Sequence, residues 1–204
     1  MNKITAANQD ELVSVTDDKN PFFEEIIIAN KARDHGWLRW KKVTEHLLPG
    51  RTIYRASCPN YQTSQGLTQE AVDWLKQNEV SSIISFNAVP YNQAELDRLN
   101  AAGISYRHYK TEDFTSPSTK DLKEAAAFHE SFPTAVTLIH CGYGHGRTGT
   151  GVSAIQLYVS DGVCPTEQQW VIDNKVETKG QIESLRGLAA YYKAHPRKRL
   201  DGEE

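Results

Sequence analysis

The sequence predicts an α/β fold: a central, mainly parallel sheet flanked by helices, with a helical cluster at the C-terminal end. Three observations lead to this prediction. Short apolar runs typical of buried strands alternate with helical patterns between residues 53 and 139. Strands joined by helices form parallel sheets that are covered on both faces. After residue 151 only helical patterns remain, and the 39% apolar and 24% charged residues are typical of an ordinary globular domain.

The N-terminal region is predicted to differ from the rest. Residues 1–20 are polar and acidic, so we expect a loose leader. Residues 22–48 are predicted to be helical with an interruption near Gly36. The apolar residues behind this prediction recur at helical spacing: Trp37, Trp40, Val43 and Leu47. The predicted organisation is therefore a leader over 1–20, a helical extension packed on the domain over 21–50, the α/β domain itself over 51–196 and a polar tail over 197–204.

The elements of the domain follow in order. Strands are predicted at residues 53–56, 83–86, 104–109 and 135–139. The helices between them are expected to begin after Thr68, which is suited to cap a helix, and to cover 93–102 and 119–131. Three more helices are expected beyond the last strand, over 148–160, 165–175 and 179–194.

Charge and cysteine usage exclude several classes of protein. A net charge of −3 argues against a chain that coats nucleic acid or anionic membrane through its overall field. No apolar run approaches the roughly 20 residues of a membrane span, so we expect a cytoplasmic monomer without a transmembrane segment, and leave export open. Three cysteines without a Cys-x-x-Cys pair predict neither a zinc site nor a disulfide framework. No metal or cofactor is predicted.

A glycine-rich segment follows the most apolar predicted strand and leads into a helix. It reads His140-Cys141-Gly142-Tyr143-Gly144-His145-Gly146-Arg147-Thr148-Gly149. Ligands of parallel sheets bind beyond the carboxyl ends of the strands. Glycines allow successive amide N–H groups to converge on an anion, with the positive end of the next helix behind them. A cysteine in such a nest is favoured as a nucleophilic thiolate, and Arg147 is suited to grip two oxygens of a phosphate.

Three other interpretations of this segment remain. Gly144, Gly146 and Gly149 satisfy the dinucleotide pattern G-x-G-x-x-G, but no strand with an acidic residue follows at the required distance. A nucleotide P-loop needs Gly-Lys, a dipeptide that the chain lacks. Cys141 as a buried, inert small residue is the third, and it leaves Arg147 without an explanation.

The segment resembles the signature of the cysteine-dependent protein tyrosine phosphatase superfamily, His-Cys-x-x-Gly-x-x-Arg-Ser/Thr, in its dual-specificity-like branch. It matches at His140, Cys141, Gly144, Arg147 and Thr148, and the resemblance extends over about residues 52–195. It implies a phosphatase-like fold and metal-free hydrolysis of a phosphomonoester through a cysteinyl-phosphate. The phosphate oxygens are then expected on Arg147 and on the backbone of Gly142, Tyr143, Gly144, His145 and Gly146.

The resemblance also implies a general acid on a loop about 30 residues before the cysteine. Asp113 lies 28 residues before Cys141 and is favoured over Glu112 and Asp121 because the residues that follow it resemble the family's loop. By the same resemblance, Thr148 is expected to hydrogen-bond the cysteine sulfur, and His140 to organise the loop from its buried side.

Three further residues carry weaker expectations. Gln181 is a candidate to position the hydrolytic water, and equally a residue of an ordinary helix N-terminus. Arg55 is expected to brace the phosphate-binding segment from the neighbouring strand, with an exposed ion pair as the alternative. Cys58 follows that strand and is a candidate redox partner of Cys141, whereas Cys164 is expected to be a packing residue.

The expected substrate is phosphotyrosine in proteins, with phosphoserine and phosphothreonine as further candidates. The first alternative is a phosphoinositide or inositol phosphate, for which His145 would supply partial positive charge, more at mildly acid pH. The second is a non-catalytic module that binds phosphorylated partners.

Overall fold

The computed structural model describes residues 21–132 and 136–197 and contains one five-stranded sheet in the order β1-β2-β5-β3-β4. The strands are β1 (Lys41–Val43), β2 (Thr52–Ala56), β3 (Ser82–Ser85), β4 (Ser105–His108) and β5 (Val136–His140). β2, β5, β3 and β4 pair in parallel, and β1 is antiparallel to β2. The predicted fold class, with its mainly parallel sheet, is confirmed.

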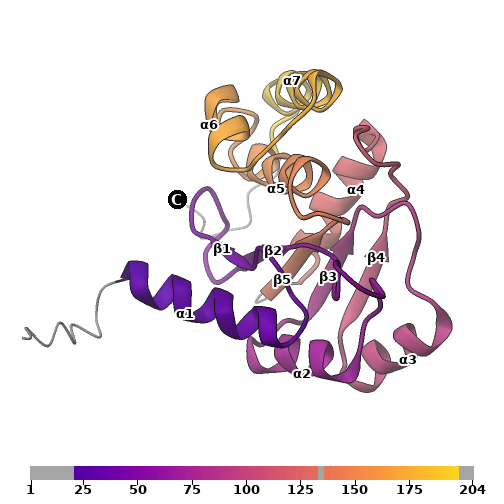
Figure 1. The fold of residues 1–204 in the computed structure, drawn as a ribbon. Coiled ribbons are helices and arrows are strands. Elements are labelled where there is room, and N and C mark those ends of the chain that lie inside the picture. Colours follow the sequence, from indigo (N-terminus) through magenta and orange to yellow (C-terminus); the bar gives the residue numbers. More distant parts are fainter. Residues whose placement is uncertain (1–20, 133–135, 198–204) are drawn as a thin grey trace, which may run out of the picture.

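Seven helices accompany the sheet in the described residues. They are α1 (Pro21–Asp34), α2 (Gln69–Gln77), α3 (Gln93–Ala101), α4 (Thr119–Glu130), α5 (Gly146–Val159), α6 (Glu167–Ile172) and α7 (Lys179–Ala194). Figure 1 shows α4 to α7 gathered on one side of the sheet, opposite α2 and α3. Thr68 caps α2 as predicted by accepting the Ala71 amide, whereas α6 is shorter than predicted. None of the helices described is long and apolar enough to cross a lipid bilayer.

The prediction that the chain is helical again after Gly36 is wrong. α1 ends at Asp34, before Gly36, which has a φ of +87°. The next element of the chain is the strand β1. Trp37 is fully buried and donates its indole N–H to the Ala71 carbonyl at 3.0 Å, and Val43 lies in β1. The apolar spacing in this region therefore reflects burial beside the sheet. The domain boundaries themselves stay a prediction.

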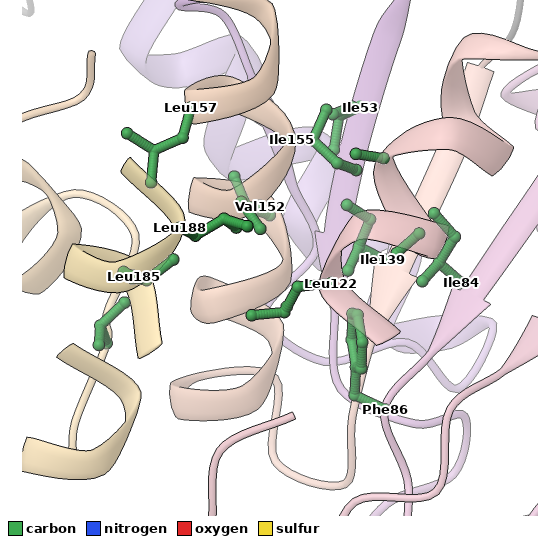
Figure 2. Close-up of a cluster of buried hydrophobic side chains, with 14 of the residues drawn as sticks. Ile53, Ile84, Phe86, Leu122, Ile139, Val152, Ile155, Leu157, Leu185 and Leu188 are labelled. Carbon is green, nitrogen blue, oxygen red and sulfur yellow. The ribbon is translucent and has the colours of Figure 1, made fainter. Parts of the chain in front are cut away.

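Successive side chains of the central strands point to opposite faces of the sheet and pack into two hydrophobic cores. Ile84 and Ile139 face the side of α4, α5 and α7, whereas Ile83 and Leu138 face the opposite side. Figure 2 shows the first core, where Ile84 and Ile139 lie close to Leu122 of α4 and near α5. This packing holds α5, whose N-terminus forms one wall of the candidate site, against the carboxyl end of β5.

Gly149 in α5 lets the helix approach the segment that precedes α7. A Cβ at this position would lie 1.9 Å from the backbone oxygen of Asn174. We therefore expect Gly149→Ala to lower the free energy of unfolding by about 3 kcal/mol, because backbone must shift. Gly187→Ala in α7, where a Cβ meets nothing within 4 Å, is the matched control and should raise it by up to about 1 kcal/mol. Urea unfolding measures both variants. Equal changes in the free energy of unfolding for Gly149→Ala and Gly187→Ala would contradict the close approach of α5 to Asn174.

Two buried histidines make stability depend on pH. Burial lowers the pKa of both His129 and His140 from 6.5 to about 4. Their neutral forms therefore contribute stability that is fully present above pH 6.5 and is lost as the pH falls towards 4. Lowering the pH from 7 to 5 should cost about 2 kcal/mol of unfolding free energy per histidine. Urea unfolding of His129→Gln should show a smaller loss than the wild type, and an unchanged pH dependence would contradict this.

Candidate active site

Cys141 lies directly after β5, at the carboxyl end of the central strand. Residues 141–147, which we call the phosphate loop, connect this strand to α5. The Cys141 side chain is buried, and its Sγ accepts the amide N–H of Gly144 at 3.3 Å. Gly144 has a φ of +94°, and a Cβ there would lie 2.7 Å from the Ala56 carbonyl group, so the loop can curl only with glycine at this position. The structure thus places the sulfur inside the loop, in front of the α5 N-terminus.

Arg147 lies in the first turn of α5 and is almost fully buried. Its Nη1 donates to the carbonyl oxygens of Thr111 at 2.8 Å and Phe86 at 3.3 Å. Its Nη2 donates to Asp113 Oδ1 at 2.6 Å. The guanidinium is therefore fixed in orientation by carbonyl groups, while its remaining edge is held by an exposed carboxylate that an incoming phosphate can replace.

Of the three acidic candidates, the structure brings only Asp113 to the phosphate loop. Glu112 forms an ion pair with Lys110 at 3.4 Å, and Asp121 takes part in the cap of α4 with Ser118. Asp113 lies in the loop after β4 and is two-thirds exposed, in contact with Arg147. The geometry supports the predicted choice.

Arg55 and His140 lie on the buried side of the phosphate loop. Arg55 contacts the loop, and His140 directly precedes it in β5. The buried Arg55 guanidinium donates to the Gly144 carbonyl at 2.9 Å and to the Asn174 carbonyl at 2.7 Å, so the alternative of an exposed ion pair is wrong. His140 is fully buried, lies 3.1 Å from the Tyr91 hydroxyl and stacks on its ring. Arg55 therefore contacts the phosphate loop as predicted, whereas the role of His140 in organising the loop stays a prediction.

Thr148 differs from expectation in its contacts, and Gln181 lies at the start of a helix, which was one of its two predicted roles. The Thr148 hydroxyl is buried without a hydrogen-bond partner, so the expected bond to the Cys141 sulfur is not formed in this structure. Gln181 is buried at the start of α7; its Oε1 accepts the amides of Glu177 and Thr178, and its Nε2 donates to the Thr115 carbonyl at 3.0 Å. Gln181 thus ties the loop of Asp113 to α7, and because its Nε2 carries a second N–H, its role in positioning the hydrolytic water stays a prediction.

The structure adds Glu177, which no sequence motif singles out. Its Oε2 accepts the Gly146 amide at 3.0 Å, and its other oxygen lies 3.8 Å from His145 Nδ1. Burial, and then the cations Arg55, Arg39 and Lys175, lower the pKa of His145 to about 4. Burial and these cations thus oppose a positive charge on His145 at mildly acid pH.

Glu177 should weaken anion binding, because its carboxylate engages an amide of the phosphate loop and repels a second anion. We expect Glu177→Gln to lower the dissociation constant for inorganic phosphate about fivefold at pH 7. Glu183→Gln in α7, an exposed carboxylate paired with Lys179 at 3.6 Å, is the control and should leave binding unchanged. Weaker phosphate binding in Glu177→Gln would show that Glu177 supports the loop instead. Titration calorimetry measures both.

Two tyrosines and an arginine form the rim of the loop, and only Tyr143 was expected there. The Arg39 guanidinium lies 3.3 Å from the centre of the Tyr143 ring and donates to the Tyr143 carbonyl at 3.1 Å. The Tyr61 ring meets the Tyr143 ring edge-on at 5.7 Å. Arg39 falls within the segment predicted to be helical and Tyr61 within a loop, so only the tertiary fold could reveal this rim.

Cys58 is fully buried, and its amide donates to the Gly142 carbonyl at 2.9 Å. Burial and the neighbouring Cys141 raise the pKa of the Cys58 thiol to about 12, which disfavours the thiolate that would form a disulfide. The redox pairing with Cys141 stays a prediction. Over residues 21–132 and 136–197, no group of three or more His, Cys, Asp or Glu side chains is arranged to hold a metal ion.

Comparisons with solved structures agree with this architecture. A mutant form of Tk-PTP superposes with a TM-score of 0.57 at 24% identity, covering 72% of this chain and 95% of its own. Kinase associated phosphatase, with its catalytic cysteine substituted by serine, gives 0.56 at 20% identity, covering 71% and 88%. PTPMT1 in complex with PI(5)P gives 0.56 at 16% identity, covering 71% and 94%. At these identities the likeness establishes the fold.

The fold and the loop after β5 define a phosphatase of the protein tyrosine phosphatase class, dual-specificity-like, as the sequence predicts. The profile of one family, described as "Polymorphic toxin system, DSP-PTPase phosphatase", matches residues 58–162. The chain belongs to this family. A search of curated protein sequences finds no match.

Proposed function

We propose that the protein hydrolyses phosphotyrosine in protein substrates, with Cys141 as nucleophile and Asp113 as general acid. The observation that supports this most is the contact of Asp113 with Arg147 at 2.6 Å, at the mouth of a loop whose interior holds the Cys141 sulfur. The candidate nucleophile and phosphate ligand of one loop thus lie beside a candidate proton donor from a second loop, the one that follows β4.

In the first step, the Cys141 thiolate attacks phosphorus in line with the ester oxygen. The phosphate dianion displaces Asp113 from Arg147 and takes its place on the guanidinium, while amides of the phosphate loop bind the remaining oxygens. The S–P bond forms, the P–O bond to tyrosine breaks, and the protonated Asp113 carboxyl gives its proton to the departing oxygen. The product is a cysteinyl-phosphate.

In the second step, water attacks phosphorus and transfers a proton to Asp113. The P–S bond breaks with its electron pair on sulfur, which restores the thiolate and releases inorganic phosphate. The unpartnered, buried Thr148 hydroxyl is suited to donate to this sulfur once it carries charge. Gln181 acts in this scheme by holding the Asp113 loop, through the Thr115 carbonyl.

The rim favours an aromatic phosphate ester. Tyr61 and Tyr143 flank the entrance, and the Tyr61 ring lies 3.8 Å from the position of a Gly142 Cβ. Aromatic side chains pair with an aryl group edge-on or offset. Inositol phosphates are less favoured, because the loop contains no lysine, His145 is neutral above about pH 5, and Glu177 adds negative charge.

The family's place in polymorphic toxin systems favours target phosphoproteins outside the producing cell over the cytoplasmic role that the sequence predicts by default.

The test is phosphate release from a panel of substrates at equal concentration. It compares phosphotyrosyl, phosphoseryl and phosphothreonyl peptides with inositol phosphates and with vesicles that contain PI(5)P. We expect the highest kcat/KM for phosphotyrosyl peptides, without inhibition by EDTA. A preference for inositol phosphates or lipid would overturn the proposed substrate, and tight peptide binding without turnover would favour a binding module.

A further inference from the structure

A cavity of about 780 Å³ lies on the outer side of the phosphate loop. We call it the side cavity. It is lined by α1, by β1 with the residues that follow it, and by the end of α6. Figure 1 shows where these elements lie in the fold. Its wall includes His145 of the phosphate loop and Arg55, which holds the Gly144 carbonyl. Cys141, Arg147 and Asp113 are not part of this wall. The volume lies in the range of ligand-binding pockets, so the side cavity is a second site that shares a wall with the first.

Cations outnumber carboxylates around the side cavity. Three carboxylates line it, of which Glu25 is paired with Lys41 at 3.3 Å and Glu45 lies 3.9 Å from His46. The lysines and arginines of the wall are Arg39, Lys41, Lys42, Arg55 and Lys175. Within the described parts of the chain, only Lys41 among these five has a carboxylate oxygen within 4 Å. The remaining positive charge is available to an anionic ligand.

Arg55 is the most buried cation of this wall. The side chain is 4% exposed, and its hydrogen bonds go to two backbone carbonyls. Desolvation lowers the pKa of Arg55 to about 10, although the charges of Cys141 and Glu177 act in the opposite direction. Buried guanidinium groups are normally balanced by a carboxylate, because an uncompensated buried charge is costly. An anion in the side cavity would balance this charge.

The other features of the side cavity fit an extended peptide. β1 is an edge strand, so one row of its backbone groups is open to a further strand. Its exposed Lys41 and Lys42 oppose the addition of a basic or neutral chain and match an acidic one. Ile26 and Ile172, which are 42% and 54% exposed, supply apolar contacts on either side.

Arg39 connects the two sites. It lines the side cavity, and its guanidinium covers the Tyr143 ring at the rim of the phosphate loop. A peptide whose phosphorylated side chain enters the loop can therefore run over Tyr143 and Arg39 into the side cavity.

We propose that the side cavity binds acidic side chains that flank the phosphorylated residue of a protein substrate. This inference rests on the proposed function and deepens it: the preferred substrates carry a cluster of aspartate or glutamate beside the phosphotyrosine. Edge-strand pairing fixes the peptide backbone, and Lys42 and Lys175 engage its carboxylates.

The test is a series of phosphotyrosyl peptides in which a pair of glutamates, or of glutamines, is moved through the positions on either side of the phosphotyrosine. At one set of positions we expect the glutamate peptide to have a kcat/KM about tenfold higher than its glutamine counterpart. Lys42→Glu and Lys175→Glu should each abolish this preference and leave the turnover of a small aryl phosphate unchanged. Lys76→Glu, an exposed residue of α2 outside the side cavity, makes the same charge change and should keep the preference.

The outcomes separate the inference from the proposed function. Equal kcat/KM for glutamate and glutamine peptides at every position would overturn the side-cavity proposal alone, and so would an equal loss of preference in Lys76→Glu. Hydrolysis of the aryl phosphate without hydrolysis of any peptide would overturn both. A preference for inositol polyphosphates over monophosphates that disappears in Lys42→Glu would replace the acidic peptide by a polyphosphate.

Discussion

Cys141→Ser is expected to reduce kcat by roughly 10⁴-fold or more on every phosphate monoester. A serine hydroxyl in the same loop is far less acidic than a thiol, so it stays protonated at neutral pH and is a poor nucleophile. Arg147 and the loop amides are unchanged, so inorganic phosphate should still bind with a dissociation constant within about threefold of the wild type. Phosphate-release assays measure the first effect and titration calorimetry the second.

Cys164→Ser is the matched control for this prediction. Cys164 is half-buried in the turn after α5, away from the phosphate loop, and its substitution should leave kcat unchanged. Activity of Cys141→Ser within tenfold of the wild type would exclude a thiol nucleophile. Loss of phosphate binding together with turnover would point to a collapsed loop instead.

Asp113→Asn is expected to slow the enzyme according to the leaving group. For phosphotyrosyl peptides kcat should fall by about 10²–10⁴-fold, the usual contribution of general acid catalysis. For aryl phosphates with strongly acidic phenols the loss should be much smaller, because the departing oxygen needs no proton. Phosphate should also bind more tightly, since the carboxylate that occupies Arg147 is removed.

Glu112→Gln and Asp121→Asn are the controls, because both carboxylates have other partners. Each should leave the dependence of kcat on the leaving group unchanged. If Asp113→Asn slows good and poor leaving groups equally, another residue is the acid. A steep leaving-group dependence in Glu112→Gln would identify that residue.

Much of this fold could be predicted because its signals are local. The strand before Cys141 is a single apolar run, and the cap at Thr68 is formed by residues close in sequence. The glycines, Cys141 and Arg147 lie within ten residues, so their convergence follows from the geometry of one loop. Asp113 could be predicted only through the resemblance, which implies an acid about 30 residues before the cysteine.

The rest depends on contacts between distant segments. β1 has three residues, too few for a periodic pattern, and Trp37, Trp40 and Val43 show helical spacing although their burial is due to the sheet. Glu177 follows α6, and Arg39 follows α1. Both contact the phosphate loop from segments far from it in the sequence, so only the folded chain brings them together. The charge of −3 averages over the chain and conceals the positive wall of the side cavity.

The most direct test of the account is to trap the covalent intermediate. The enzyme is mixed with excess aryl phosphate, quenched with acid during turnover, digested and examined by mass spectrometry. The account predicts one phosphoryl group on the peptide that contains Cys141, absent from the Cys141→Ser protein treated in the same way. A phosphoryl group on another residue, such as His145, or rapid turnover without any phosphorylated peptide, would contradict it.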